Sequence, residues 1–203
     1  MENSAQRSLM RKCVFFSALG VSVIAGSLAT ATPAHATLWR NFKYSNSNTP
    51  LYLKSGSLQE GLAIMPYGNV TNFIWSQSPD PVGSGYWRLV PSQQPPGKTV
   101  VAGVWNGDMT EGFPVVTEPE NGTFSQHWLP GAAIYDNNGA LCYVFFNRKD
   151  LSKVLSVVTQ TRVKLVNIVN YAADVAGNHP EQAWCAYTFD ANGNPVPQTP
   201  PPF

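Results

Sequence analysis

The chain has 203 residues and a formal net charge of +1 at pH 7, with 43% hydrophobic and only 12% charged residues. This length and composition fit one domain with a sizeable core. A near-neutral chain lacks the basic surface that nucleic acids or anionic membranes need, so we expect neither as a main partner.

The first 36 residues have the pattern of a secretory signal peptide. Basic residues between Arg7 and Lys12 precede an apolar stretch, and the small-x-small pattern Ala34-His35-Ala36 follows it. We therefore expect residues 1–36 to be removed and residues 37–203 to be secreted into an extracellular or periplasmic compartment. A permanent membrane anchor is the weaker alternative. No later stretch is long and apolar enough for a membrane span.

The cysteine content depends on this cleavage. Cys13 lies in the signal segment, so the mature chain keeps Cys142 and Cys185. An oxidising compartment favours one disulfide between them, and two buried free thiols are the alternative. Together with His127 and His179 these cysteines lack the ligand spacing of a structural zinc site, so we expect no metal and no cofactor.

Short strands and tight turns follow one another along the mature chain. Runs rich in β-branched and aromatic residues predict strands at 98–105, 141–146, 154–158 and 163–169. Tight turns with positive φ are predicted at four Asn-Gly pairs: Asn106-Gly107, Asn121-Gly122, Asn138-Gly139 and Asn192-Gly193. No long segment has a helical period, so the sequence predicts an all-β sandwich or barrel. The Pro-rich end, 191–203, predicts a solvated polyproline II tail.

An internal repeat narrows the choice of fold. Three opening strands can be laid over one another, with Trp39, Trp87 and Cys142 in equivalent positions. Each copy ends on a tryptophan: Trp75, Trp128 and Trp184. Four short strands in about fifty residues cannot bury a core alone, whereas three copies around a pseudo-threefold axis can close a barrel. The three terminal tryptophans are then expected to point inward.

Two of the copies end in Gln126-His127-Trp128 and Gln182-Ala183-Trp184. With these motifs the sequence resembles the ricin B-type β-trefoil lectins, whose repeat ends in Gln-x-Trp. The first copy has Phe73-Ile74-Trp75 and lacks the glutamine. The resemblance implies a β-trefoil of three pseudo-symmetric four-stranded repeats over residues 37–190. It also implies that Cys142 and Cys185 lie on neighbouring barrel strands, where a disulfide fits.

The resemblance implies sugar binding only in part. The family's pocket combines an Asp shortly after the start of strand two, an aromatic platform on the last hairpin, and an Asn near its turn. Leu53, Val101 and Ser156 occupy the Asp position to within about one residue, and Glu118 occupies the platform position of the second copy. No copy keeps the full set.

The chain nevertheless contains groups that bind sugars in proteins: aromatic rings pack on the C–H surface of a pyranose, and side-chain amides bond to its hydroxyls. In the second copy, Trp105 is expected to be exposed at a hairpin tip, either as a binding residue or as a cap of the hairpin, and Asn121 and Gln126 remain from the family's pocket. The third copy has a longer loop at 170–181, which forms either a pocket of its own or a short surface excursion without a ligand. The candidate ligand-binding residues are Trp105, Asn121, Gln126, Asn170, Tyr171, Asp174 and Gln182.

Enzymatic interpretations find little support. No nucleophile signature surrounds Ser125, and the acidic residues on the loops of the second copy do not form a pair across a cleft. Strand alternation places His127 on the face opposite Gln126 and Trp128, exposed or facing a groove. We therefore expect no catalytic residue. The sequence predicts a lectin-like domain that binds a glycan or glycoprotein, alone or beside a separate catalytic subunit as in a toxin. The alternative is a trefoil that binds protein without sugar, such as a hydrolase inhibitor or an adhesion module.

Overall fold

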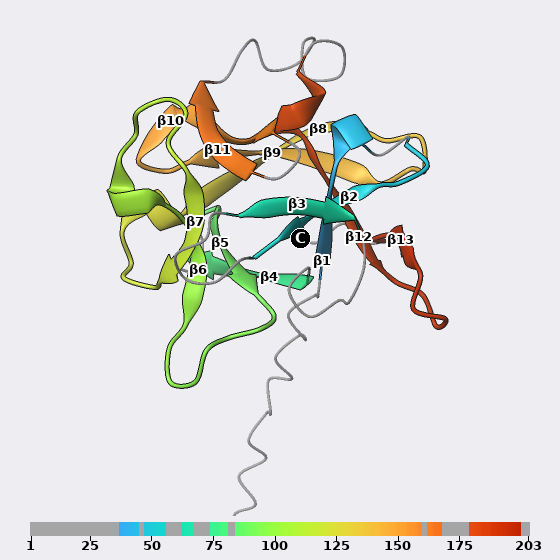
Figure 1. Ribbon diagram of the computed structural model, residues 1–203, viewed down its shortest axis with the longest axis horizontal. Coiled ribbons are helices and arrows are strands. Elements are labelled where there is room, and N and C mark those ends of the chain that lie inside the picture. The colour runs from blue at the N-terminus through green and yellow to red at the C-terminus, as the bar shows by residue number, and fades with distance from the viewer. Residues whose placement is uncertain are drawn as a thin grey trace, which may run out of the picture. The chain divides into compact units, whose positions relative to one another are not determined.

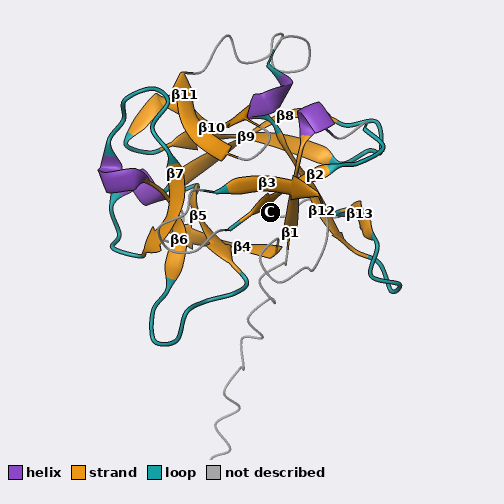
Figure 2. Cartoon of the chain, viewed as in Figure 1, coloured by secondary structure: helices purple, strands orange, loops and turns teal. Residues whose placement is uncertain are grey.

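The computed structural model describes residues 37–44, 47–55, 62–66, 74–80, 84–159, 162–167 and 179–199. Within these ranges the chain consists of short β-strands, loops and single 3-10 turns (Figure 2). The described part contains no helix that is long and apolar enough to cross a bilayer. The segment predicted to be a signal peptide lies outside the described residues.

The strands fall into three consecutive groups of four, followed by one short strand. The first group is β1 Thr37–Asn41, β2 Leu51–Lys54, β3 Ala63–Pro66 and β4 Ile74–Asp80. The second group is β5 Tyr86–Pro91, β6 Val100–Val104, β7 Val115–Pro119 and β8 Trp128–Tyr135. The third group is β9 Leu141–Asn147, β10 Asp150–Thr159, β11 Arg162–Asn167 and β12 Trp184–Phe189, before β13 Pro195–Pro197. The described 3-10 turns are Phe42–Tyr44, Trp105–Gly107, Phe124–Gln126 and Pro180–Gln182.

The first and fourth strands of the three groups close a six-stranded antiparallel barrel. Around the barrel, β1 pairs with β4, β4 with β5, β5 with β8, β8 with β9, β9 with β12, and β12 again with β1. Because the ring closes, no barrel strand has an unpaired edge, which explains how repeats too small to fold alone become stable together.

The second and third strands of each group form a hairpin, β2–β3, β6–β7 and β10–β11 (Figure 1). The hairpins meet through their third strands. Leu62 donates its backbone N–H to Val115 O (2.8 Å) and accepts one from Val163 (2.9 Å). Pro114 and Lys164 form a bridge between the other two hairpins. Six barrel strands and three such hairpins define a β-trefoil, as the sequence predicts.

The three terminal tryptophans are fully buried and are bonded in the same way. Each indole Nε1–H donates to a carbonyl of the second strand of its own group: Trp75 to Leu53 (3.1 Å), Trp128 to Ala102 (3.0 Å) and Trp184 to Leu155 (3.0 Å). The inward direction of these side chains is confirmed, and the bond satisfies the polar end of a buried ring.

The strand register corrects the alignment of the opening strands. Trp75 pairs with Thr37, Trp128 with Trp87, and Trp184 with Tyr143. The residues equivalent to Trp87 are therefore Thr37 and Tyr143, not Trp39 and Cys142. Matching one tryptophan to another misplaced the first copy by two residues.

Trp39 instead fills a second layer of the core. Its ring meets the ring of Phe145 edge to face at a centroid distance of 4.9 Å, and the ring of Trp87 lies 6.5 Å away. Strand alternation repeats every two residues, so a shift of two keeps the side chain on the inner face. Because Trp39 faces inward in either alignment, the hydrophobic pattern of the sequence did not reveal the two-residue error.

An asparagine stands opposite the tryptophan of each Gln-x-Trp motif. Asn147 pairs with Trp128 and donates its amide to Ser125 O (3.0 Å). Asn41 pairs with Trp184 and donates in the same way to the carbonyls of Glu181 and Ala183. These bonds satisfy carbonyls of the 3-10 turns that precede β8 and β12.

The copy without a motif glutamine also lacks this asparagine. Trp75 pairs with Pro91, which has no amide side chain to donate. The first copy thus lacks both the glutamine before its tryptophan and the asparagine opposite it.

The predicted disulfide is present. Cys142 and Cys185 face each other directly in the β9–β12 ladder, and a disulfide joins them. Both residues are fully buried.

The prediction of a solvated tail over residues 191–203 is wrong for residues 195–198. β13 pairs with β12, and the buried Gln198 accepts a hydrogen bond from Thr37 Oγ1 (2.8 Å). Proline is tolerated here because β13 is an edge strand, where a missing N–H breaks no central ladder. The tail thus ties the end of the domain to the start of β1.

Candidate functional site

Three of the predicted ligand-binding residues lie around the β6–β7 hairpin of the second copy (Figure 1, green, left). Trp105 follows β6, and Asn121 and Gln126 follow β7. In the hairpin register Val101 pairs with Glu118, and Gly103 pairs with Val116. This pairing brings Glu118 and Gly103 diagonally together across the hairpin.

The carboxyl group of Glu118 lies directly over Gly103. A Cβ added to Gly103 would lie 2.8 Å from Glu118 Cδ and would collide with Oε1. Only a glycine leaves this space open, so the strand-two glycine and the strand-three acid form one feature. From sequence, Glu118 was only the residue at the position of the family's aromatic platform. Its packing over Gly103 was not predicted.

Gln126 holds the carboxyl group in place. Its Nε2 donates to Glu118 Oε1 (3.0 Å) and to Pro119 O (2.8 Å), and its Oε1 accepts from Asn121 N (2.9 Å). The side chain is fully buried. All three bonds stay within the hairpin and its turn, so we assign Gln126 to supporting the site rather than to touching a ligand.

Burial raises the pKa of Glu118 above its ordinary value, and the hydrogen bond from Gln126 opposes this rise. Among the described residues, Gln126 is the hydrogen-bond partner of this carboxylate, through Oε1. The second oxygen is available to accept hydrogen bonds from a ligand.

Asn121 is exposed at the turn after β7. Its Oδ1 accepts from the backbone N–H (3.0 Å) and the hydroxyl (2.7 Å) of Thr123. Its side-chain amide N–H groups have no hydrogen-bond partner in the described part of the chain. Asn121 therefore offers fixed donors in the turn that follows the strand of Glu118.

Trp105 stands at the other end of the hairpin, in a 3-10 turn. Asn106 and Gly107 both have positive φ (53° and 65°), as the Asn-Gly pattern predicts. This turn touches the 3-10 turn before Trp128, because a Cβ on Gly107 would lie 3.5 Å from Ser125 Oγ. Trp105 is 36% exposed, which confirms its predicted exposure.

The other two copies do not repeat the glycine and acid pair. The tryptophan hydrogen bonds show that Leu53, Ala102 and Leu155 are equivalent, so the next residues, Lys54, Gly103 and Ser156, are equivalent too. This corrects the Asp positions assumed from sequence, Leu53 and Val101, by one and two residues. From the hairpin registers, Met65 and Val166 stand where the second copy has Glu118.

Of the candidate ligand-binding residues in the third copy, the structure describes only Gln182. Asn170, Tyr171 and Asp174 lie outside the described residues. Gln182 is buried in the 3-10 turn that is equivalent to the turn of Gln126. In the described ranges, no group of three or more His, Cys, Asp or Glu side chains could hold a metal ion.

The predicted exposure of His127 is wrong. His127 is only 3% exposed, its Nδ1 lies 3.1 Å from a guanidinium nitrogen of Arg148, and its ring lies 6.1 Å from that of Phe124. β8 begins at Trp128, so strand alternation does not extend to His127, and Phe124 and Arg148 fold over it. His127 therefore belongs to the packing beside the 3-10 turn.

No family model matches the chain, and no curated protein matches it. Solved structures do. The designed threefold-symmetric protein ThreeFoil has a TM-score of 0.51 and 17% identity over 74% of this chain and 96% of its own. The Polyporus squamosus lectin, solved bound to a human-type influenza-binding epitope, has a TM-score of 0.51 and 16% identity over 77% of this chain and 50% of its own.

A mosquitocidal holotoxin has a TM-score of 0.54 and 18% identity, over 75% of this chain and 17% of its own. This chain therefore spans about a sixth of the holotoxin and half of the Polyporus lectin. At such low identities the likeness establishes the fold. The protein is a β-trefoil, and its structural neighbours include trefoil lectins.

Proposed function

We propose that the protein is a secreted, non-catalytic, lectin-like domain that binds a glycan or glycoprotein through the β6–β7 hairpin of its second copy. The observation that carries this proposal is the Glu118 carboxylate, which occupies the space over Gly103 and is held there by Gln126. This carboxylate takes the place of the strand-two acid that the chain lacks.

The groups of the hairpin match the chemistry of a pyranose. The carboxylate of Glu118 accepts hydrogen bonds from hydroxyls and the amide of Asn121 donates to them. The ring of Trp105, at the other end of the hairpin, offers an apolar face to the C–H groups of a neighbouring sugar in a longer glycan. Two or three hydrogen bonds and one ring contact, each contributing about 1 kcal/mol, correspond to a Kd near 1 mM. Binding to a multivalent surface would raise the apparent affinity.

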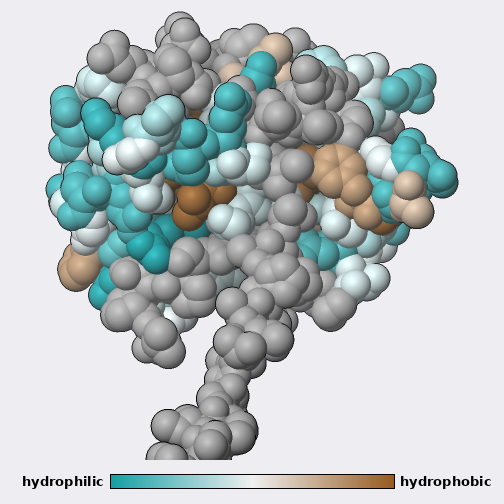
Figure 3. All heavy atoms as spheres, turned by 90° about the horizontal axis from the view of Figure 1, so that it is seen from below, coloured by the Kyte–Doolittle hydropathy of each residue, from teal (hydrophilic) through white to brown (hydrophobic). Residues whose placement is uncertain are grey.

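The compartment and the neighbouring structures support the same proposal. The disulfide between Cys142 and Cys185 suits an oxidising compartment, in agreement with export through a signal peptide over residues 1–36. On the face drawn in Figure 3, most of the described surface is hydrophilic, which is compatible with a polar ligand. Structural neighbours that are lectins favour the sugar ligand further.

A role as the binding subunit of a larger secreted assembly is consistent with the neighbours. In the holotoxin, and in an endo-β-galactosidase of Clostridium perfringens of which this chain spans 32%, the trefoil is one part of a longer chain. We propose that a separate catalytic subunit is a partner of this protein.

Direct protein binding is the second candidate function. The exposed rings of Phe124 (53%) and Tyr135 (68%) favour it, because aromatic side chains are enriched at protein interfaces. A trefoil that acts as a hydrolase inhibitor or adhesion module would use such rings and would not need Glu118.

A glycan array with residues 37–203 tests the proposal. The wild-type domain should bind a subset of glycans, and Glu118→Gln should lose them. Glu111→Gln makes the same charge change on an exposed turn of the same copy and should bind as wild type does. Absence of binding across a broad panel, or full binding by Glu118→Gln, would reject this site.

A further inference from the structure

The Glu118 carboxylate brings a negative charge into half-buried surroundings. Its Oε1 lies over Gly103 and accepts a hydrogen bond from the fully buried Gln126. Withdrawing a carboxylate from water costs free energy, which raises the pKa of Glu118, and the one neutral amide offsets only part of this cost. A positively charged ligand group would offset more of it than a neutral group.

The described part of the protein supplies no cation to this carboxylate. Its described ion pairs join Arg88 to Glu120 and His179 to Glu181, and neither of them includes Glu118. Arg88 lies on β5 of the same copy and bonds to Glu120, two residues beyond Glu118. The negative charge of Glu118 is therefore left for a ligand to match.

An ammonium group suits the second oxygen of Glu118 better than a hydroxyl does. It has three N–H donors and no acceptor, and a hydrogen bond between two ionised groups is shorter and stronger than one with a neutral donor. Partial burial adds to the attraction, because the surrounding water screens the two charges less. A ligand carboxylate at the same place would be repelled, so acidic sugars do not fit this site.

The neighbouring amide favours a sugar over a lysine side chain as the source of the ammonium. The Gln126 side chain links Glu118 to Asn121, because it donates to Glu118 Oε1 and accepts from the backbone N–H of Asn121 (2.9 Å). The exposed Asn121 holds its Oδ1 on Thr123, which leaves its amide N–H groups to donate to a ligand. The hydroxyls of a pyranose accept such bonds, whereas the methylene stem of a lysine has no acceptor.

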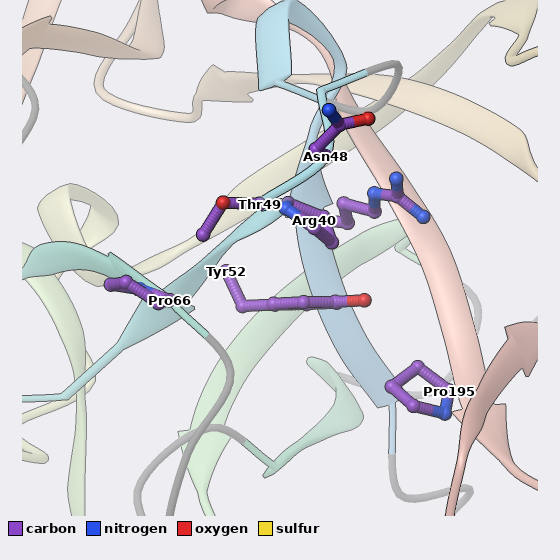
Figure 4. A pocket seen from close by; sticks show the side chains of 7 residues that line it. Arg40, Asn48, Thr49, Tyr52, Pro66 and Pro195 are labelled. Carbon is purple, nitrogen blue, oxygen red and sulfur yellow. The ribbon is translucent and has the colours of Figure 1, made fainter.

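The other copies lack this charge. Met65 and Val166 stand at the position of Glu118 in the first and third copies. The first copy instead contributes to a groove of about 350 Å³, whose lining includes Asn48 and Thr49 (Figure 4). None of the described lining residues is Asp or Glu, so this groove offers an ammonium no carboxylate and serves as an internal control.

We propose that the site at Glu118 takes an amino sugar, a pyranose with an unsubstituted and protonated amino group, with the ammonium on Glu118 and a ring hydroxyl on Asn121. This inference rests on the proposed function and names the class of sugar that the site binds. N-acetylated sugars and neutral hexoses have no positive charge and bind more weakly there.

NMR titration of residues 37–203 with matched methyl glycosides tests this inference. The probes are methyl glucosaminide and methyl galactosaminide, each compared with its parent hexoside and its N-acetylated form at about pH 6.5, where a sugar ammonium and an ordinary carboxylate are both ionised. At least one amino sugar should bind at least about fivefold more tightly than its two neutral analogues and shift the amide signals of Glu118 and Asn121. The difference should shrink as salt rises from about 50 to 500 mM. Equal binding within both sets, or no binding by either amino sugar, would overturn the inference.

Variants assign the preference to Glu118. Glu118→Gln removes the charge and keeps the shape of the side chain, so it should bind the amino sugar no more tightly than the neutral analogues. Glu111→Gln makes the same charge change on an exposed turn of the same copy and should keep the preference. The amides of Asn48 and Thr49 should not shift with any probe. A preference that persists in Glu118→Gln, or shifts confined to the groove of Asn48 and Thr49, would contradict the assignment.

Two further comparisons identify which claim fails. Nα-acetyl-lysine amide carries the same ammonium without a sugar ring, and binding as tight as that of the amino sugar would contradict a sugar as its source. Neutral glycans that bind on the array and are lost in Glu118→Gln, without any advantage for amino sugars, would leave the proposed function standing and overturn this inference alone. No binding on the array and none by the probes would reject both.

Discussion

Replacing Gln126 by alanine should destabilise the domain by about 3 kcal/mol. The substitution removes two neutral hydrogen bonds, to Pro119 O and from Asn121 N, and one to the carboxylate of Glu118. The neutral bonds contribute about 1 kcal/mol each, and the bond to a charged group about 1.5–3 kcal/mol. Glu118 is partly exposed, so water replaces part of the last contribution. For a domain of this size, 3 kcal/mol lowers the Tm by roughly 6–12 °C.

Urea denaturation of residues 37–203, followed by tryptophan fluorescence, measures this loss. Gln126→Ala should shift the midpoint to lower urea with an unchanged slope. Asn121→Ala is the control. Within the described ranges the exposed Asn121 side chain bonds only to Thr123, so the substitution should cost less than about 1 kcal/mol. If Gln126→Ala costs no more than this control, Gln126 does not hold the hairpin, and its assignment as a supporting residue is wrong.

Further predictions concern Gly103, the pKa of Glu118, the disulfide and β13. Gly103→Ala should displace the Glu118 carboxyl and abolish glycan binding on the array, and it should lower the Tm less than Gln126→Ala does, because it breaks only the bond to Glu118 among the three that Gln126 makes. The raised pKa of Glu118 means that the folded state binds its proton more tightly than the unfolded state. Glycan binding should therefore fall with decreasing pH sooner than an ordinary Glu would allow, and Glu118→Gln should be at least as stable as wild type at neutral pH. Reduction of Cys142–Cys185, which closes a sequence separation of 43, should lower the free energy of unfolding by about 4 kcal/mol, measured with and without reductant. Truncation after Asn194 removes the β13 ladder and the Gln198 bond, and should cost about 2 kcal/mol by the same denaturation assay.

Much of the fold follows from the sequence because its signals are local. Alternating β-branched and aromatic runs mark the strands, and Asn-Gly pairs mark turns, as Asn106 and Gly107 show. The tryptophan at the end of each copy marks the repeat, because the three indoles occupy equivalent positions in the core. The pairing of Cys142 with Cys185 then follows once the strands are placed on neighbouring positions.

The candidate site depends on the register between β6 and β7, which cannot be read from the sequence. Glu118 meets Gly103 only because β6 and β7 pair with Val101 opposite Glu118, and a slip of one residue would turn the acid to the other face. The sequence signal for this site was the presence of a glycine in the second strand of the copy and an acidic residue in the third.

The position of the C-terminal strand was hidden for another reason. β13 lies at the far end of the mature sequence from β1 and comes close to it only because β13 joins β12. The high proline content predicted a solvated tail. Composition alone cannot show that a proline-containing segment pairs as an edge strand with a neighbouring strand, as β13 does with β12. The same limit applied to His127, which is covered by Arg148 from the turn between β9 and β10.

The central claim is that the β6–β7 hairpin of the second copy binds a glycan through Glu118. NMR titration of residues 37–203 with a glycan selected on the array tests it most directly. The account predicts saturable shifts of the Glu118 and Asn121 amides and of the Trp105 indole N–H, and the loss of these shifts in Glu118→Gln. Shifts confined to other copies, or the same shifts in Glu118→Gln, would contradict it.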